Sequence, residues 1–407
     1  MAQMEGEGNM GEAGTGSAAE VFWAFLRLGL TSFGGPVAHL GYFRDEFVVR
    51  RRWLDDVAFG ELAALCQFLP GPASSQLGFA IGLKRAGGFA GGLAAWLGFT
   101  LPSAGLLVGL AAGAGAVAGT PLAVAVVHGL KLVAVVVVAQ AVLGMSRTLT
   151  PDGRRAAIAL LSAAIVALAA GAAAPVAAIA IGALLGLWLC REGAEPLALH
   201  AAIPVSRRAA GLALAAFALL LAIALVPLAS WAPIDFFAAF YRSGALVFGG
   251  GHVVLPLLKT AVVPQWISSA DFLAGYGLAQ AMPGPLFTFA AWLGFLAHPG
   301  GGLPGATVAL VGIFLPGLLL VYGVLPFWDG LRHRVAVQAA MRGANAAVVG
   351  ILAAALYNPV WTGAVTDARD FTLALAGFLA LTVWRFPPWL VVVLLGAAGA
   401  ISGLVGP

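Results

Sequence analysis

Long apolar runs set the strongest limit on how this chain can fold. Between residues 121 and 145 only a histidine, a lysine and a glutamine interrupt apolar residues, and similar runs recur along the chain. About 20 consecutive apolar residues span the hydrocarbon core of a bilayer. Backbone groups in lipid must be satisfied internally, and no segment alternates as a barrel strand does, so these runs are predicted helices. With 61% hydrophobic and 9% charged residues, the chain is predicted to be an all-α polytopic membrane protein.

The number and limits of the membrane segments follow less directly. The sequence predicts ten to thirteen hydrophobic segments, some of which do not cross the bilayer fully. Residues 1–19 are glycine-rich and acidic and lack a basic stretch, so they are predicted to form a disordered tail and not a cleaved leader. Cys66 and Cys190 show no partner spacing, which argues against a disulfide framework or a metal site and favours a packing role.

An internal repeat is the clearest pattern in the sequence. Residues 25–36 read FLRLGLTSFGGP and align without gaps with residues 240–251, FYRSGALVFGGG. Further matches at nearly constant offset are QFLPGP with QAMPGP, GFTLP with GIFLP, and HGLKLVAVV with RGANAAVVG, which begin at residues 67 and 280, 98 and 312, and 128 and 342. So many matches predict two homologous repeats.

The predicted domain organisation follows from these matches. Residues 20–190 form a first half and residues 235–407 a second half. Residues 191–234 join them as a basic linker plus an extra apolar segment.

The charge of equivalent loops predicts how the halves are oriented. Residues 43–53 hold four arginines, whereas the equivalent 258–266 hold one lysine. The bias reverses farther along, because residues 113–121 are uncharged and the equivalent 328–334 are basic. Basic loops favour the cytoplasmic side, so opposite bias at equivalent loops predicts repeats of inverted topology.

Each half carries two helix-breaking segments, here called the FGG and PGP motifs. Glycine and proline are poor helix formers, and non-helical backbone at membrane depth is tolerated only where protein buries it or where it lines a cavity. The two PGP motifs are predicted to lie at the turns of re-entrant hairpins, residues 57–83 and 270–297. Asp55 or Asp56 is predicted to cap the start of the first hairpin, and Ser268 or Ser269 the start of the second.

Broken helices in inverted-repeat transporters present N–H groups to an anionic substrate, and the sequence predicts such a site here. Arg27 and Arg242 are equivalent charges in apolar surroundings that could bind an oxyanion or extend to the membrane interface. Gln67 and Gln280 could donate to the same ligand or bond between helices. The predicted substrate-binding residues are Arg27, Gly34, Gly35, Gln67, Pro70, Gly71, Pro72, Arg242, Gly249, Gly250, Gln280, Pro283, Gly284 and Pro285, with Lys131, Asn345 and His252 as second-tier residues.

Proton coupling would need a titratable group. Glu61 is the one carboxylate inside a predicted membrane segment, and burial there would favour its protonated form. The alternative is a solvated carboxylate or one paired with Arg50, Arg51 or Arg52. His39, His128 and His252 could also titrate near neutral pH or serve as hydrogen-bonded packing residues.

These motifs resemble a known family. FGGP followed by LPGP in residues 25–82 resembles the amino-terminal domain of the chromate ion transporters, and FGGG followed by MPGP in residues 240–285 is similar to their carboxy-terminal domain. The resemblance implies two domains of opposite topology. It also implies export of chromate across the inner membrane, commonly by proton antiport, which confers chromate resistance. The family's motif positions fall on Arg27, Trp53, Gln67, the FGG motifs and the PGP motifs.

Other functions remain open or are excluded. Chromate and sulfate are similar dianions, so a transporter of sulfate or another oxyanion is an alternative, as is a passive anion channel. The chain is not predicted to be an enzyme, because it has no CxxC, no HExxH, no GxGxxG that follows a predicted strand, and no GxxxxGK[ST] loop. The predicted partners are a chromate-like or sulfate-like oxyanion and the lipid bilayer, with no cofactor and no nucleic acid, and a homodimer is left open.

Overall fold

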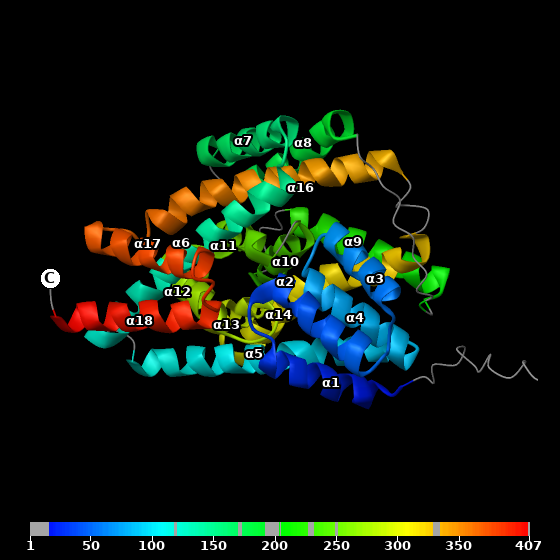
Figure 1. The fold of residues 1–407 in the computed structure, drawn as a ribbon, viewed down its shortest axis with the longest axis horizontal. Helices are drawn as coiled ribbons and strands as arrows, with labels where there is room; N and C mark the ends of the chain where they lie inside the picture. Colours follow the sequence, from blue (N-terminus) through cyan, green and yellow to red (C-terminus); the bar gives the residue numbers. More distant parts are fainter. Residues whose placement is uncertain are drawn as a thin grey trace, which may run out of the picture.

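The computed structural model describes residues 16–117, 120–169, 173–191, 203, 205–226, 232–248, 251–328 and 334–405. These residues form helices and connecting turns, without a strand among them (Figure 1). The all-α fold predicted from the sequence is confirmed.

The first half contains eight α-helices among its described residues and one π-helical turn, η1. Their bounds are α1 Ala18–Thr31, α2 Gly35–Arg44, η1 Asp45–Arg50, α3 Asp56–Phe68, α4 Ala73–Ala86, α5 Phe89–Val117, α6 Pro121–Leu149, α7 Gly153–Leu168 and α8 Ala173–Leu189.

The remaining helices belong to the connecting region and the second half. They are α9 Arg207–Leu225, α10 Ala232–Ala245, η2 Gly251–Val253, α11 Val254–Val262, α12 Ser269–Ala279, η3 Leu286–Thr288, α13 Phe289–Leu296, α14 Gly302–Val324, η4 Leu325–Phe327, α16 Val335–Ala355, η5 Leu356–Trp361, α17 Ala368–Thr382 and α18 Pro388–Val405.

Five helical segments among the described residues are long and apolar enough to cross a membrane. They are α5, α6, α9, α14 with its extension to Phe327, and α16 with its extension to Trp361. Four shorter apolar helical segments accompany them, namely Ala173–Leu189, Gly251–Val262, Leu286–Leu296 and Pro388–Ser402. The chain is therefore a multi-pass membrane protein.

The helices are interrupted where the glycines and prolines predict. In the first half, α3 ends at Phe68 and α4 begins at Ala73, on either side of LPGP. In the second half, α12 ends at Ala279 and the next short helix begins at Leu286. Whether these pairs re-enter one membrane face stays a prediction.

The predicted caps of the two hairpins are confirmed. The Asp55 side chain accepts the Ala58 N–H at 2.7 Å, and the Ser268 hydroxyl accepts the Asp271 N–H at 3.0 Å. A short polar side chain of this kind satisfies one of the donors that every helix start leaves unpaired.

Equivalent helices of the two halves make the same close contacts. In the first half α1 packs against α5, where a side chain on Gly29 would collide with the carbonyls of Gly98 and Phe99. In the second half α10 packs against α14, and a side chain on Gly244 would collide with the carbonyl of Ile313. Small residues let helix backbones approach closely where the surrounding lipid gives no hydrophobic driving force.

The last two helices of each half pack against the other half. The α7–α8 pair of the first half lies along α16 of the second half, and the α17–α18 pair of the second half lies along α6 of the first half (Figure 1). Glycines permit both crossings: Gly343 approaches Gly182, and Gly129 approaches the carbonyl of Leu395. Through this exchange each half contributes to the packing of the other.

Candidate functional site

Two backbone hydrogen bonds join the PGP motif of each half to the start of the FGG motif of the other. The Gly71 N–H donates to the carbonyl of Val247 at 2.7 Å, and the Gly284 N–H donates to the carbonyl of Ser32 at 2.9 Å. Val247 and Ser32 stand at equivalent places, each directly before the phenylalanine of an FGG motif. Within each half the helix after the FGG motif also contacts the helix after the PGP motif, α2 with α4 and η2 with η3, so the four broken segments adjoin one another and are called here the central site.

Both PGP glycines need their missing side chain. Gly71 has a φ of 121° and Gly284 a φ of 87°, in the left-handed region that other residues rarely adopt. A Cβ on Gly71 would lie 3.0 Å from the Cα of Gly317, and one on Gly284 would lie 3.0 Å from the Phe99 carbonyl oxygen. Each PGP motif thus rests against the long proline-containing helix of the other half, α14 or α5.

The first-half helices that begin at the central site lack side-chain caps. Gly34 precedes α2 and Pro72 precedes α4, and neither supplies a side-chain hydrogen bond to the helix start. Side chains of Ser17, Asp55, Thr120, Asp152, Ser206, Ser268 and Asp367 cap other helices. An uncapped helix start leaves N–H groups and a partial positive charge available to a ligand. Uncapped starts also occur away from this site, at α14 and α16.

Several buried polar atoms without a hydrogen-bond partner in the described part of the chain belong to residues at or next to these helix starts. In the first half they include both ring nitrogens of His39, which is 0% exposed and lies near the Ser32 backbone without forming a hydrogen bond of good geometry. Native proteins leave few buried polar groups unpaired, so such a group is a candidate for contact with water or a bound ligand. The first-half set comprises Ser32 Oγ, His39 Nδ1, His39 Nε2, Ser75 Oγ, Gln76 Oε1, Trp96 Nε1 and Thr100 Oγ1.

Several contacts tie these groups to the central site. Ser32 accepts the Gly284 N–H through its own carbonyl. The Gln76 amide nitrogen donates to the carbonyls of Pro70 at 2.9 Å and Gly317 at 3.0 Å, which leaves its oxygen unpaired. The His39 ring lies 5.1 Å from the Phe99 ring, centroid to centroid, and Thr100 follows Phe99 on α5.

The predicted cationic residues lie in different settings. Arg27 is exposed on α1. Arg242 is half-buried on α10, and its Nη1 donates to the Ala224 carbonyl at 3.1 Å, close to the end of α9. The two equivalent arginines therefore differ in exposure, and Arg242 has a protein acceptor within hydrogen-bond range.

The predicted glutamines also differ. Gln67 is exposed on α3, whereas Gln280 is half-buried, and its amide lies near the Tyr276 hydroxyl without a hydrogen bond of good geometry to any described residue. Nearby on the same half, His252 Nδ1 lies 2.8 Å from the Tyr276 hydroxyl.

Other predicted residues fall as follows. Gly71, Pro72, Pro283, Gly284 and Pro285 are buried, and Pro70 is half-buried. Gly34 is exposed and Gly35 half-buried, with φ values of 101° and 78°. Gly249 and Gly250 lie outside the described residues. Lys131 on α6 and Asn345 on α16 are both half-buried, and Asn345 Oδ1 is unpaired within the described chain.

Glu61, the predicted proton-coupling residue, is buried on α3 with 8% exposure. The arginines considered as alternative partners have other carboxylates beside them. Arg51 pairs with Glu46 at 2.7 Å, and Arg50 pairs with Asp45 at 3.0 Å.

The polar residues that surround the PGP and FGG motifs were not predicted from the sequence. Ser32, Ser75, Gln76 and Thr100 each lie within a few residues of a break motif or of the GFTLP segment. Their repeat equivalents are Val247, Thr288, Phe289 and Phe314. Comparing the two halves for polar residues replaced by apolar ones would have identified three of the four.

Comparisons with known proteins agree with these motifs. A protein-family model described as "Chromate transporter" matches residues 19–187 and again residues 234–400. A chromate transport protein of Pseudomonas aeruginosa is 30% identical, over 96% of this chain and 93% of its own length. A chromate transport protein of Cupriavidus metallidurans is 27% identical, over 86% of this chain and 84% of its own length.

Shorter proteins match as well. An uncharacterized transporter of Bacillus subtilis is 35% identical over 41% of this chain and 85% of its own length. It thus corresponds in size to about half of this chain. No solved structure matches the chain.

Proposed function

Because this chain belongs to the chromate transporter family, we propose that it is a secondary active transporter that exports chromate, CrO4²⁻, across the inner membrane. Export would lower the internal chromate concentration and so confer chromate resistance. The chromate transport proteins that it resembles over nearly their whole length support this substrate.

The observation that carries the proposal is the reciprocal pair of hydrogen bonds at the central site. It brings broken backbone from both halves together beside uncapped helix starts and unpaired buried donors. The substrate would accept hydrogen bonds from the N–H groups at the starts of α2 and α4 and from Ser32, His39 and Thr100. Donors of this kind can hold a dianion without a buried permanent positive charge.

The energetics favour outward movement of a dianion. Moving one charge across 100 mV changes the free energy by about 2.3 kcal/mol. Movement of a dianion out of a cell that is about 100 mV negative inside therefore lowers the free energy by about 4.6 kcal/mol. Proton antiport would add to this and would need a group that alternates between charged and neutral forms. We assign that role to Glu61, which is buried on the first PGP hairpin.

The halves are proposed to be inverted repeats that alternate access to the central site. The reversed distribution of basic residues between equivalent loops supports inversion, and the exchanged terminal helices connect the halves mechanically. A passive anion channel could share this architecture but would need no titratable coupling residue.

Transport in everted membrane vesicles tests the proposal. Vesicles from a chromate-sensitive host that expresses the full chain should accumulate chromate, and an imposed proton gradient should increase the rate. Glu61→Gln should retain chromate movement and lose the response to the gradient. Conductance that survives every carboxylate substitution would indicate a channel instead.

The same vesicles distinguish the substrates. Chromate and sulfate have similar shape and charge, and none of the groups at the central site can recognise the central atom. We expect sulfate to compete weakly with chromate. Uptake of sulfate that chromate does not displace would establish the sulfate alternative, and movement of neither anion would refute the substrate assignment.

A further inference from the structure

An apolar cavity of about 350 Å³ lies between helices of both halves and of the connecting region. Its walls come from α4 and α5 of the first half, from α9, and from α14 of the second half. Leu318 of the lining directly follows Gly317, whose backbone lies against the first PGP motif, so the cavity adjoins the crossing of the two halves. The lining consists of aliphatic and aromatic side chains, among them Phe79, Phe89, Leu93, Ala213, Leu318 and Tyr322.

The cavity opens toward lipid and not toward water. Three of its four walls, α5, α9 and α14, are among the five segments that are long and apolar enough to span a membrane. Phe89 is 54% exposed and Leu93 is 37% exposed, and Leu212, beside Ala213 of α9, is 73% exposed. Large apolar side chains exposed on membrane-spanning helices lie among acyl chains. The cavity is therefore continuous with the hydrocarbon core of the bilayer.

One end of the cavity lies at the membrane–water interface, because three helix ends meet there. Phe89 begins α5 and Tyr322 lies in the last turn of α14, and their rings are 5.7 Å apart, centroid to centroid. A Cβ on Gly323 would lie 2.6 Å from the Leu214 side chain, which places the end of α14 against the amino-terminal part of α9. Tyrosine, with an apolar ring and a polar hydroxyl, is typical of this interface.

Three basic side chains lie close to this end of the cavity. Lys84 precedes Phe89 by five residues, across the turn that joins α4 to α5. Arg207 and Arg208 begin α9, and Arg208 lies five residues, or about 8 Å along the helix, from Ala213. None of the three forms an ion pair or a side-chain hydrogen bond within the described part of the chain. The rim of the cavity thus carries positive charge that no described carboxylate neutralises.

We propose that the cavity holds an acyl chain of an anionic membrane lipid, whose phosphate lies at the rim beside Lys84, Arg207 and Arg208. Water does not fill an apolar cavity, because it would lose its hydrogen bonds there. An apolar cavity of about 150 Å³ accommodates a benzene ring, so this one has room for roughly a dozen chain carbons. Lipid binding here does not depend on which anion is transported.

The charge of the rim selects an anionic headgroup over a neutral one. Phosphate oxygens accept hydrogen bonds from guanidinium and ammonium groups, and long basic side chains extend along apolar surface to reach them. Anionic lipids are concentrated in the cytoplasmic leaflet. The extension of α14 ends at Phe327, directly before residues 328–334, the basic loop whose charge predicts a cytoplasmic position. A chain bound in the cavity would support α14 where it crosses α4 and α5.

Native mass spectrometry of the purified full chain tests the binding of the acyl chain, with phosphatidylglycerol as the anionic probe and phosphatidylcholine as the neutral one. The wild-type chain should retain phosphatidylglycerol in preference. Ala213→Phe places a ring in the cavity and should lower phosphatidylglycerol retention roughly ten-fold. The matched control Ala215→Phe adds the same ring at an exposed position of α9 and should retain the lipid. Equal retention by these two variants would show that the cavity holds no chain.

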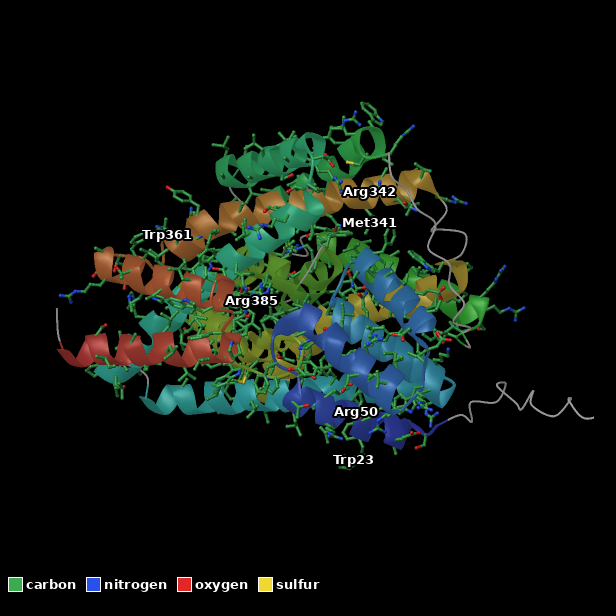
Figure 2. All side chains as sticks on the ribbon, viewed as in Figure 1. Trp23, Arg50, Met341, Arg342, Trp361 and Arg385 are labelled. Carbon is green, nitrogen blue, oxygen red and sulfur yellow. The ribbon has the colours of Figure 1, made fainter. Side chains whose placement is uncertain are left out.

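The double variant Arg207→Gln/Arg208→Gln tests the headgroup, and it remains informative if Ala213→Phe does not fold, because both arginines are exposed. It should lower the preference for phosphatidylglycerol over phosphatidylcholine about ten-fold. The control Arg369→Gln/Arg385→Gln removes the same charge from exposed positions and should keep the preference; Figure 2 shows Arg385 in the C-terminal region, away from α9. An unchanged preference in the double variant, or equal retention of both lipids by the wild-type chain, would overturn the proposal.

Discussion

The two halves of the central site share a backbone but not a set of side chains. The PGP glycines make equivalent hydrogen bonds, and equivalent glycines bring α1 to α5 and α10 to α14. The side chains around them differ: His39 of the first half corresponds to Val254 of the second, and both are fully buried.

The same difference recurs at other buried positions. Thr100 corresponds to Phe314, and Glu61 corresponds to Ala274. Ser32 and Gln76 likewise correspond to Val247 and Phe289 when the two repeats are aligned. Both halves thus keep the same backbone path, whereas the buried polar side chains at these positions are concentrated in the first half. We therefore expect the second half to supply an apolar wall and backbone, and the first half to supply the side chains that bind substrate.

The largest expected effect comes from breaking the feature that the halves share. Gly71→Leu or Gly284→Leu places a side chain at a positive φ and against backbone of the opposite half. Left-handed backbone costs other residues about 1–3 kcal/mol, and the steric conflict with backbone adds to it. Chromate uptake in vesicles should fall to background for both variants.

The control for these variants is Gly105→Leu. Gly105 lies within α5 and a Cβ there would meet open space. It should transport normally. Near-normal uptake by Gly71→Leu would show that the close crossing of the halves is not needed for transport.

The next effect separates the halves. Thr100→Val removes a buried hydroxyl that has no hydrogen-bond partner in the described part of the chain, with little change in volume. A hydrogen bond to a charged group is worth about 1.5–3 kcal/mol, so the KM for chromate should rise roughly 10-fold to 100-fold. Thermal unfolding should stay unchanged or shift upward, because the variant no longer buries an unpaired group. A packing role alone would leave KM unchanged.

Thr288→Val in the second half is the matched comparison. The Thr288 hydroxyl donates to the Pro285 carbonyl at 2.8 Å and is therefore already satisfied within the protein. We expect it to affect stability by about 1 kcal/mol and to leave KM within two-fold to three-fold of the original value. Equal KM effects at both positions would contradict a first-half binding site.

A smaller effect is expected from His39. His39→Phe gives the first half a bulky apolar residue where the second half has Val254, and removes two ring nitrogens that lack a well-formed hydrogen bond among the described residues. Chromate affinity should fall about 10-fold, whereas Val254→Ala should change it little. Isothermal titration of the purified variants with chromate checks both values, and unchanged affinity for His39→Phe would place substrate elsewhere.

The smallest expected effect concerns the His128–Asp370 pair, which joins α6 to α17 away from the central site. His128→Ala removes the partner of Asp370 but leaves that carboxylate with the Thr366 hydroxyl at 2.6 Å and the Thr366 N–H at 2.9 Å. The free energy of unfolding should fall by about 1 kcal/mol. Arg369→Ala, exposed on the same helix, should not change it. Thermal unfolding measures both, and equal stability would indicate that the His128–Asp370 pair contributes nothing.

Much of the local structure could be predicted because local rules decide it. The long apolar runs require helices. Gly34 and Pro72 directly precede the helices α2 and α4. Asp55 and Ser268 are helix caps whose geometry depends on only three residues of backbone. The repeat could also be detected in the sequence, since it needs only an alignment of the two halves of the chain.

The binding residues were harder to predict for a physical reason. A helix that is apolar on all sides, such as α5 or α14, has no polar face to show which side is buried against protein. Arg27 and Gln67 were predicted from their residue types, yet both are exposed, while the hydroxyls of Ser32 and Thr100 are buried and have no hydrogen-bond partner among the described residues.

The sequence by itself determined that this chain is helical, spans a membrane and is broken at the FGG and PGP motifs, because length, hydrophobicity and backbone preference act locally. Only the tertiary structure decided that Gly71 would bond to Val247 and Gly284 to Ser32, and that the terminal helices would be exchanged between the halves. Those contacts join residues far apart in the chain, and their geometry depends on how whole helices pack.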